Sequence, residues 1–158
     1  MNAVTHLGRL LYAVDQRAPA IRETGGDLMV TLVQGGESAF IVPDRAECLV
    51  EMRTPVGRAS DEALEEVRAL LEPGWHADAE PVAHRDGWSL DGTGPAADLA
   101  ARLGKELGTG PSFDAPYWME APLWQKLCPT LVCGPSGGGL HSVDEWVDLN
   151  QVRAFTSA

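Results

Sequence analysis

The residues of this chain best suited to chemistry lie in the glycine-rich segment GPSGGGLHSVDE, residues 134–145. A glycine-rich turn exposes backbone N–H groups that can hold a polar ligand group, and Gly137 and Gly138 are the expected substrate-binding positions. His141 follows, where an imidazole could coordinate a metal or contact a substrate. From spacing alone, a lone histidine after such a loop is more often solvated, so both interpretations stay open.

The cysteines offer no comparable pattern. Cys48, Cys128 and Cys133 are odd in number and lack the two-residue spacing of a zinc knuckle or a redox pair. The sequence therefore predicts buried, reduced thiols.

Hydrophobic periodicity predicts the elements of the first half. Apolar residues recur at helical spacing over residues 2–17, and Pro19, Gly25 and Gly26 predict a loop over residues 18–27. Strands are expected at 28–33 and at 46–53, the second with one wet face, and the two are expected to be neighbours. After a turn at Pro55 and Gly57, a helix continues to residue 71, and a further strand is a candidate at 77–83.

The ends of that second helix carry recognisable signals. Ser60 is expected to cap it ahead of Asp61 and Glu62, and Pro73 with Gly74 to stop it. The resulting order, helix, strand, strand and helix, is nearly that of a ferredoxin-like sandwich.

A polar, glycine-rich stretch at residues 85–92 separates the second lobe, which opens with a helix over 96–107. Residues 130–133 predict a short buried strand before the glycine-rich segment. Two capping signals compete for the last helix, Ser142 with Glu145 and Asp148 with Gln151, and periodicity does not choose between them. The predicted division is therefore 1–84 and 85–158.

Composition narrows the classes of partner. The chain has 158 residues, 44% of them apolar and 22% charged, as expected of a folded globular protein. A formal net charge of −11 argues against nucleic acid. The sequence shows neither an apolar run long enough to cross a bilayer nor a secretion signal, so a cytoplasmic protein without membrane contact is expected.

Two longer runs resemble one known family. MEAPLWQKLCPTLVCGP with LHSVDEW, within residues 116–146, is similar to the end of acetylornithine deacetylases. GGESAFIVPDRAECLVEMRTPVG, residues 35–57, is similar to the lid domain of the wider family of dinuclear zinc metallopeptidases and aminoacylases. The resemblance implies an α+β fold: an incomplete ferredoxin-like lid, or dimerisation, domain (1–84) followed by the C-terminal α/β segment of a catalytic domain (85–158).

The same resemblance implies a chemistry. Enzymes of this family hold two zinc ions, with cobalt as an alternative, bridged by a water that attacks the amide of an N-acyl amino acid such as N-acetylornithine, while a glutamate acts as general base. His141 matches the last metal ligand. Glu120 matches the glutamate of a Glu-Ala-Pro motif, where a role in orienting a ligand is favoured over ligation.

Arg53 matches an arginine whose planar fork suits a substrate carboxylate. Its alternative is a surface arginine paired with Glu51 or with a helix end. His6, His76 and His84 match none of the family's motifs and are expected to be solvated.

The resemblance is incomplete in ways that bear on function. The family's other metal ligands, its general base and a lid histidine that reaches the neighbouring subunit have no counterpart in these 158 residues, so no catalytic residue is assigned. Phe40 stands for an expected asparagine, Met119 for a threonine and Ser136 for a glycine, and the first two changes remove hydrogen-bonding groups expected to face substrate.

A lid of this kind also begins with a central strand, which has no counterpart ahead of the first helix. We therefore expect a homodimer or a complementing N-terminal fragment to fill the sheet.

Two hypotheses follow. In the first, the chain is part of a zinc-dependent deacetylase and is inactive until the N-terminal half is supplied. In the second, it is a non-catalytic dimerisation or binding module descended from such an enzyme, and the isolated chain binds no metal.

Overall fold

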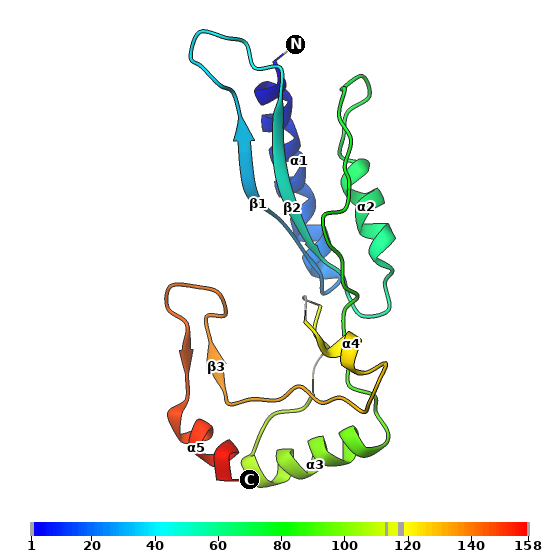
Figure 1. Cartoon of the computed structure of the whole chain (residues 1–158), viewed down its shortest axis with the longest axis vertical. Helices are drawn as coiled ribbons and strands as arrows, with labels where there is room; N and C mark the ends of the chain where they lie inside the picture. The colour runs from blue at the N-terminus through cyan, green and yellow to red at the C-terminus, as the bar shows by residue number, and fades with distance from the viewer. Residues whose placement is uncertain (1, 113, 117–118, 158) are drawn as a thin grey trace. The chain divides into compact units, whose positions relative to one another are not determined.

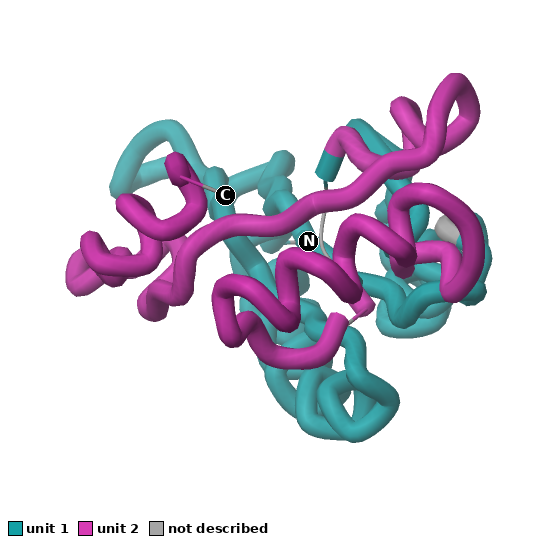
Figure 2. The backbone as a smooth tube through the Cα atoms, turned by 90° about the horizontal axis from the view of Figure 1, so that it is seen from below, with its two compact units in different colours: residues 1–88, 115–119 teal, residues 89–114, 120–158 magenta. Residues whose placement is uncertain are grey.

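A computed structural model describes residues 2–112, 114–116 and 119–157. The chain forms two compact units, residues 1–88 with 115–119 and residues 89–114 with 120–158 (Figure 2). The elements of the first unit, in chain order, are α1 (Ala3–Glu23), β1 (Asp27–Gly35), β2 (Ala46–Arg53) and α2 (Ser60–Arg68) (Figure 1). Those of the second are α3 (Pro95–Leu107), α4 (Ala121–Trp124), β3 (Gly137–Gly138), β4 (Trp146–Val147) and α5 (Leu149–Ser157).

Helix α1 is longer than its periodicity predicted. Asn2 caps it, with its Oδ1 accepting a hydrogen bond from the backbone N of Thr5 at 3.2 Å. The predicted loop at residues 18–23 is wrong, because the helix continues through Pro19 to Glu23. Ala18 and Ile21 are 4% and 1% exposed, and their burial outweighs the backbone hydrogen bond that a proline removes.

The predicted pairing of the two strands is confirmed. β1 and β2 form a two-stranded antiparallel sheet in which Leu28 faces Met52 and Val30 faces Val50. The register shifts between Val30 and Leu32, which places Thr31 in a bulge and changes the inward positions of β1 from even to odd residues.

One face of this sheet packs on α1. Its core consists of buried and half-buried apolar side chains: Val14, Ala18, Ile21, Leu28, Leu10, Val30, Val50, Met52, Val67 and Leu70. The opposite face is exposed, as the alternation in β2 predicted, with Leu49 42% exposed.

Three expectations about residues 60–83 are wrong: the cap at Ser60, the end of the second helix near residue 71 and the strand over 77–83. Helix α2 begins at Ser60 with Ala59 at the N-cap, and it ends at Arg68 rather than near residue 71. Residues 77–83 form no strand. Instead, Arg68 donates from Nη2 to the carbonyl oxygen of Ala79 at 2.9 Å, and Val82 is 80% exposed.

The second unit has a sparse interior. Gly108, with φ of 64°, ends α3 as predicted, whereas the predicted buried strand at 130–133 is wrong: this segment is irregular, and Val132 is 53% exposed. The buried apolar residues described in this unit are Ala96 and Ala121. Asp148, not Ser142, caps the last helix, because its Oδ1 accepts from the N of Asn150 at 2.8 Å.

Helices with two small antiparallel sheets give an α+β chain, as expected. The ferredoxin-like lid, the catalytic α/β segment and the boundary at residue 84 stay predictions. In the described part of the chain, none of the helices combines the length and the apolar character needed to traverse a bilayer.

Candidate functional site

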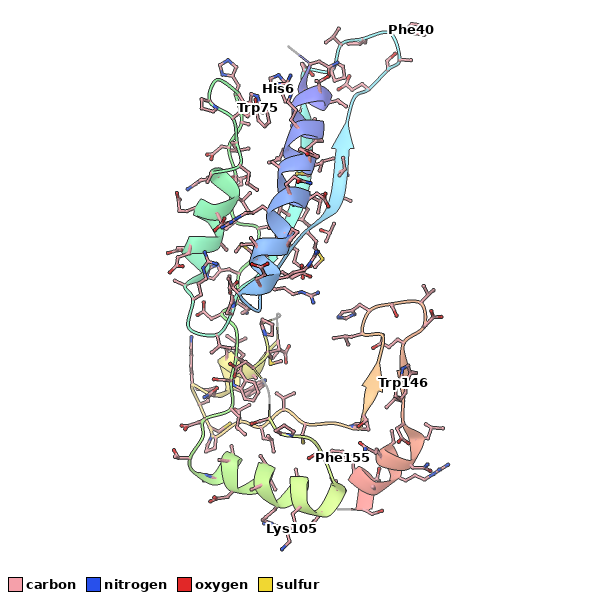
Figure 3. All side chains as sticks on the ribbon, turned by 180° about the vertical axis from the view of Figure 1, so that it is seen from behind. His6, Phe40, Trp75, Lys105, Trp146 and Phe155 are labelled. Atoms are coloured by element: carbon pink, nitrogen blue, oxygen red, sulfur yellow. The ribbon has the colours of Figure 1, made fainter. Side chains whose placement is uncertain are left out.

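His141 lies in the connection of the β3–β4 hairpin, in the second unit. Gly137 pairs with Val147 and Gly138 with Trp146, and Figure 3 shows Trp146 beside this hairpin. The structure thus brings three of the predicted site residues, Gly137, Gly138 and His141, into one supersecondary motif.

The backbone of His141 is unusual. Its φ of 62° is the left-handed conformation that side chains other than glycine adopt at a cost. Its backbone N donates to Oε2 of Glu145 at 3.3 Å, and the N of Ser142 donates to the carbonyl of Gly139 at 2.8 Å. The turn is therefore fixed by local hydrogen bonds, and the imidazole is exposed at its tip.

Close contacts with Trp146 restrict side chains at two glycines of the hairpin. A Cβ on Gly137 would lie 2.5 Å from the backbone oxygen of Trp146, and one on Gly138 would lie 2.8 Å from its Nε1. The backbone of β4 therefore lies too close for a side chain at Gly137, whereas at Gly138 a side chain would require the indole of Trp146 to move. A substrate-binding role for both glycines stays a prediction beside this packing role.

The base of the hairpin is tied to the last helix. The N of Asp148 donates to the carbonyl of Ser136 at 2.8 Å, and the N of Ser136 donates to Oε1 of Gln151 at 2.8 Å. The serine that stands for an expected glycine is thus anchored through its backbone.

The described residues do not fit a metal site on their own. Zinc sites use about three or four protein ligands, and no group of three or more histidine, cysteine, aspartate or glutamate side chains comes together in the part of the chain that the structure describes. The Oε2 of Glu145 already accepts the backbone N–H of His141. Coordination by His141 therefore requires donors from outside these residues.

Arg53 ends β2 in the first unit, where its Nε donates to Oε1 of Glu51 at 3.0 Å. This is the local ion pair that the sequence left open as an alternative to a substrate carboxylate. The side chains of Arg53 and Glu51 are 30% and 45% exposed, so a carboxylate ligand for Arg53 stays a prediction.

Glu120 lies at the N-cap of α4, with an exposed side chain that makes no capping hydrogen bond. Its carbonyl oxygen accepts from the N of Leu123 at 2.9 Å. Its expected role beside a metal ligand is untested by this geometry. The neighbouring residues 117 and 118 lie outside the described residues.

The structure corrects two expectations, that the cysteines are buried and that His6 is solvated. Cys128 and Cys133 are exposed, so only Cys48 is partly covered, and burial raises the pKa of its thiol. His6 is not fully solvated: its ring lies 5.0 Å from the Trp75 ring, centroid to centroid, as Figure 3 shows. No motif links these two rings, because α1 and the turn after α2 meet only in the folded unit.

The first unit also has an exposed apolar surface that was not predicted from the sequence. Leu32 and Val33 in β1 are each 50% exposed, and Phe40, Ile41 and Val42 in the next loop are 98%, 62% and 66% exposed. The available signal was an uninterrupted apolar run, residues 39–42, between two strands.

Comparison with known protein families gives a match over the first half of the chain. Residues 1–79 match the family model of the peptidase dimerisation domain (M20_dimer). No curated protein and no solved structure matches the chain. The matched residues contain α1, the β1–β2 sheet and α2, which is half of the chain, and leave out the hairpin that carries His141.

Proposed function

This chain belongs to the M20 peptidase family through its dimerisation domain, and from that premise we propose that it acts as an association module, binding a second copy of itself through β1. The lineage is that of metal-dependent hydrolases. The observation that carries the proposal is the exposed outer edge of β1.

The sheet has only two strands, so each of them leaves one edge unpaired by any strand among the described residues. A two-stranded sheet is marginal in water, and an open edge is a template for pairing with another chain. Residues 28–35 of β1, LMVTLVQG, contain no charge. Leu32 and Val33 are half exposed.

The edge of β2 is less suited to association. Glu47, Glu51 and Arg53 place charges along that strand, and charged side chains on an edge strand oppose pairing. On this ground β1 is the edge that we propose for the contact.

One flank of α1 extends the same surface. Val4 lies beside β1, because a Cβ on Gly35 would be 3.0 Å from its Cγ2. Gly8 and Leu11 follow Val4 on that flank at helical spacing, and a Cβ on Gly8 would meet nothing within 4 Å. The opposite flank carries Arg17, which bonds to Glu66 of α2.

Two-fold symmetry fits this surface. Most homodimers are two-fold, and an isologous contact pairs a surface with itself. Two β1 strands related by such an axis, perpendicular to the sheet, run antiparallel. The result is a four-stranded sheet with the uncharged strands at its centre.

The finer proposal concerns catalysis. With an N-terminal half that supplies the remaining metal donors and the general base, the second unit would contribute His141 to a zinc-dependent deacetylase acting on an N-acyl amino acid such as N-acetylornithine. The resemblance of residues 116–146 supports it. The isolated chain is then an association module without hydrolytic activity of its own.

Sedimentation analysis over a wide concentration range tests the proposal. Leu32→Glu places a charge on β1, and Leu49→Glu places the same charge on its cross-strand neighbour in β2. These side chains are 50% and 42% exposed, which makes them a matched pair. We expect the wild-type chain to form a dimer. The rise in its Kd caused by Leu32→Glu should be at least about ten times the rise caused by Leu49→Glu. A monomeric wild-type chain, or an equal effect of both variants, contradicts the proposal.

A further inference from the structure

The second unit buries little apolar surface that could stabilise it. Among its described residues, only Ala96 and Ala121 are buried apolar side chains, and a single methyl group gains little from burial. The hydrophobic core of the described residues lies between Leu10 and Leu70, in the first unit. Many of the large apolar side chains of the second unit are exposed instead: Leu99, Leu123, Trp124, Leu127, Val132, Leu140, Val143, Trp146, Val147, Leu149 and Val152.

The elements of the second unit are short. Helix α3 has 13 residues and α5 has 9, and isolated helices below about 12 to 15 residues are marginal in water. Gly104 lies inside α3 and lowers its helical propensity. Strands β3 and β4 have 2 residues each, and an isolated hairpin is also marginal. The order of this unit must therefore come from tertiary packing, which its exposed side chains show to be sparse.

A backbone bridge closes the first unit at the point where the chain leaves it. The N of Trp88 donates to the carbonyl of Ala115 at 3.0 Å, and the N of Ala115 donates to the carbonyl of Trp88 at 2.8 Å. Both residues are buried and belong to the first unit. A Cβ on the adjacent Gly87 would lie 3.0 Å from the carbonyl oxygen of Thr54, so the bridge is packed beside the end of β2. Residues 89–114 therefore form a closed loop that can open while this bridge stays intact.

We propose that the second unit unfolds and refolds locally while the first unit, together with the Trp88–Ala115 bridge, stays folded. Local stability follows the apolar contacts that a segment buries, and these contacts are concentrated in the first unit. The two units therefore differ in the free energy of opening, with the bridge as the boundary between them. This inference does not depend on association through β1.

Local opening limits the presentation of His141. Its left-handed backbone is adopted at a cost, and the hydrogen bonds described for its turn, to Glu145 and within residues 139–142, lie inside the hairpin itself. The imidazole is thus held in this geometry only in the fraction of molecules whose second unit is folded. A ligand that requires this geometry binds with an apparent affinity reduced by that fraction.

Residue-resolved amide exchange of the full chain in dilute solution tests the inference. We expect the amides near Val14 and Ile21 in α1 to be protected at least about a hundredfold more than those of α3 and α5. The amides of Trp88 and Ala115 should be protected like those of α1, because they close the first unit. Leu103→Pro breaks α3, and Leu103→Met is the matched control, since a volume-conserving apolar exchange at the same position is tolerated.

The two variants separate local opening from a single cooperative fold. We expect Leu103→Pro to abolish protection in α3 and to change that of α1, Trp88 and Ala115 by less than about twofold, whereas Leu103→Met keeps protection in both units. Equal protection of the two units in the wild type overturns the inference, as does a loss of protection in α1 with Leu103→Pro. Amides of Trp88 and Ala115 that exchange as fast as those of α3 also overturn it, because the bridge then opens with the second unit.

Discussion

Nε of Arg17 in α1 lies 2.6 Å from Oε1 of Glu66 in α2, so this ion pair joins the two helices of the first unit. Arg58 reaches the same carboxylate, with Nη2 3.3 Å from Oε2. The hydrogen bond from Arg17 is the main cause of the lowered pKa of Glu66. The side chain of Glu66 is 16% exposed, so solvent screens it only in part.

Replacing Glu66 tests how much this pair stabilises the unit. We expect Glu66→Gln to lower the free energy of unfolding by about 1 kcal/mol or less, measured by urea denaturation at pH 7. Glu65→Gln is the control, because that side chain is 71% exposed, and we expect a smaller effect. Equal effects of the two variants would show that the pair joining the helices adds no more than the exposed pair of Glu65 with Arg68.

The pH dependence of the same variant has a defined sign. A carboxylate whose pKa is lower in the folded state stabilises that state above its unfolded pKa, about 4.3. The difference between wild type and Glu66→Gln should be constant near neutral pH. It should shrink as the pH falls below about 4.3 and vanish below the folded pKa. A difference that grows with acidity would contradict the lowered pKa of Glu66.

Truncation of the first core should be costly. Ile21 and Leu28 are each 1% exposed, so Leu28→Ala removes a fully buried side chain and leaves a cavity. We expect a loss of about 2 to 5 kcal/mol in the free energy of unfolding, against less than about 0.5 kcal/mol for the exposed Val82→Ala. Thermal or urea denaturation followed by circular dichroism measures both.

The hairpin glycines should differ in their tolerance of alanine. At Gly137 the added Cβ meets the backbone oxygen of Trp146, whereas at Gly138 it meets the end of the indole, which can rotate. Gly137→Ala should therefore disturb the hairpin more than Gly138→Ala, as read from amide exchange of residues 136–148. The reverse order would argue against the close strand approach described above.

Zinc content tests the assignment of His141. We expect the isolated chain to hold zinc only at background, and His141→Ala to leave that content unchanged, because one imidazole does not make a site. With the family's N-terminal half added, zinc retention should fall in His141→Ala. Stoichiometric zinc in the isolated chain would contradict the first expectation, and no fall in the second experiment would remove His141 as a ligand.

Local pattern predicted much of the first unit. The alternation in residues 46–53 placed a strand with one wet face, and the apolar spacing over residues 2–17 placed most of α1. The predicted end of α1 was wrong. Pro19 is a local signal for a helix break, whereas the burial of Ile21, which favours a longer helix, depends on tertiary packing. The bulge at Thr31 depends on how β1 pairs with β2, and the local sequence contains no signal for it.

The second unit was harder to predict. Residues 130–133 have the composition of a buried strand, but no strand pairs with them in the described part of the chain, so composition alone misled. Asp148 was one of two capping candidates, and only the fold chose it. The sequence placed His141 after a glycine-rich turn, whereas Gly137 and Gly138 form β3 and His141 lies in the connection to β4. Its left-handed backbone and its bond to Glu145 follow from that turn.

Residue-resolved amide exchange of β1, measured at concentrations spanning the dimer Kd, tests the central claim most directly. In an antiparallel strand, alternate N–H groups point to the paired side and to the free edge. We expect the edge-facing N–H groups of β1 to exchange rapidly in dilute solution and to become protected as the dimer fraction rises. Unchanged exchange in β1 while dimers form, or new protection confined to β2, would contradict association through this strand.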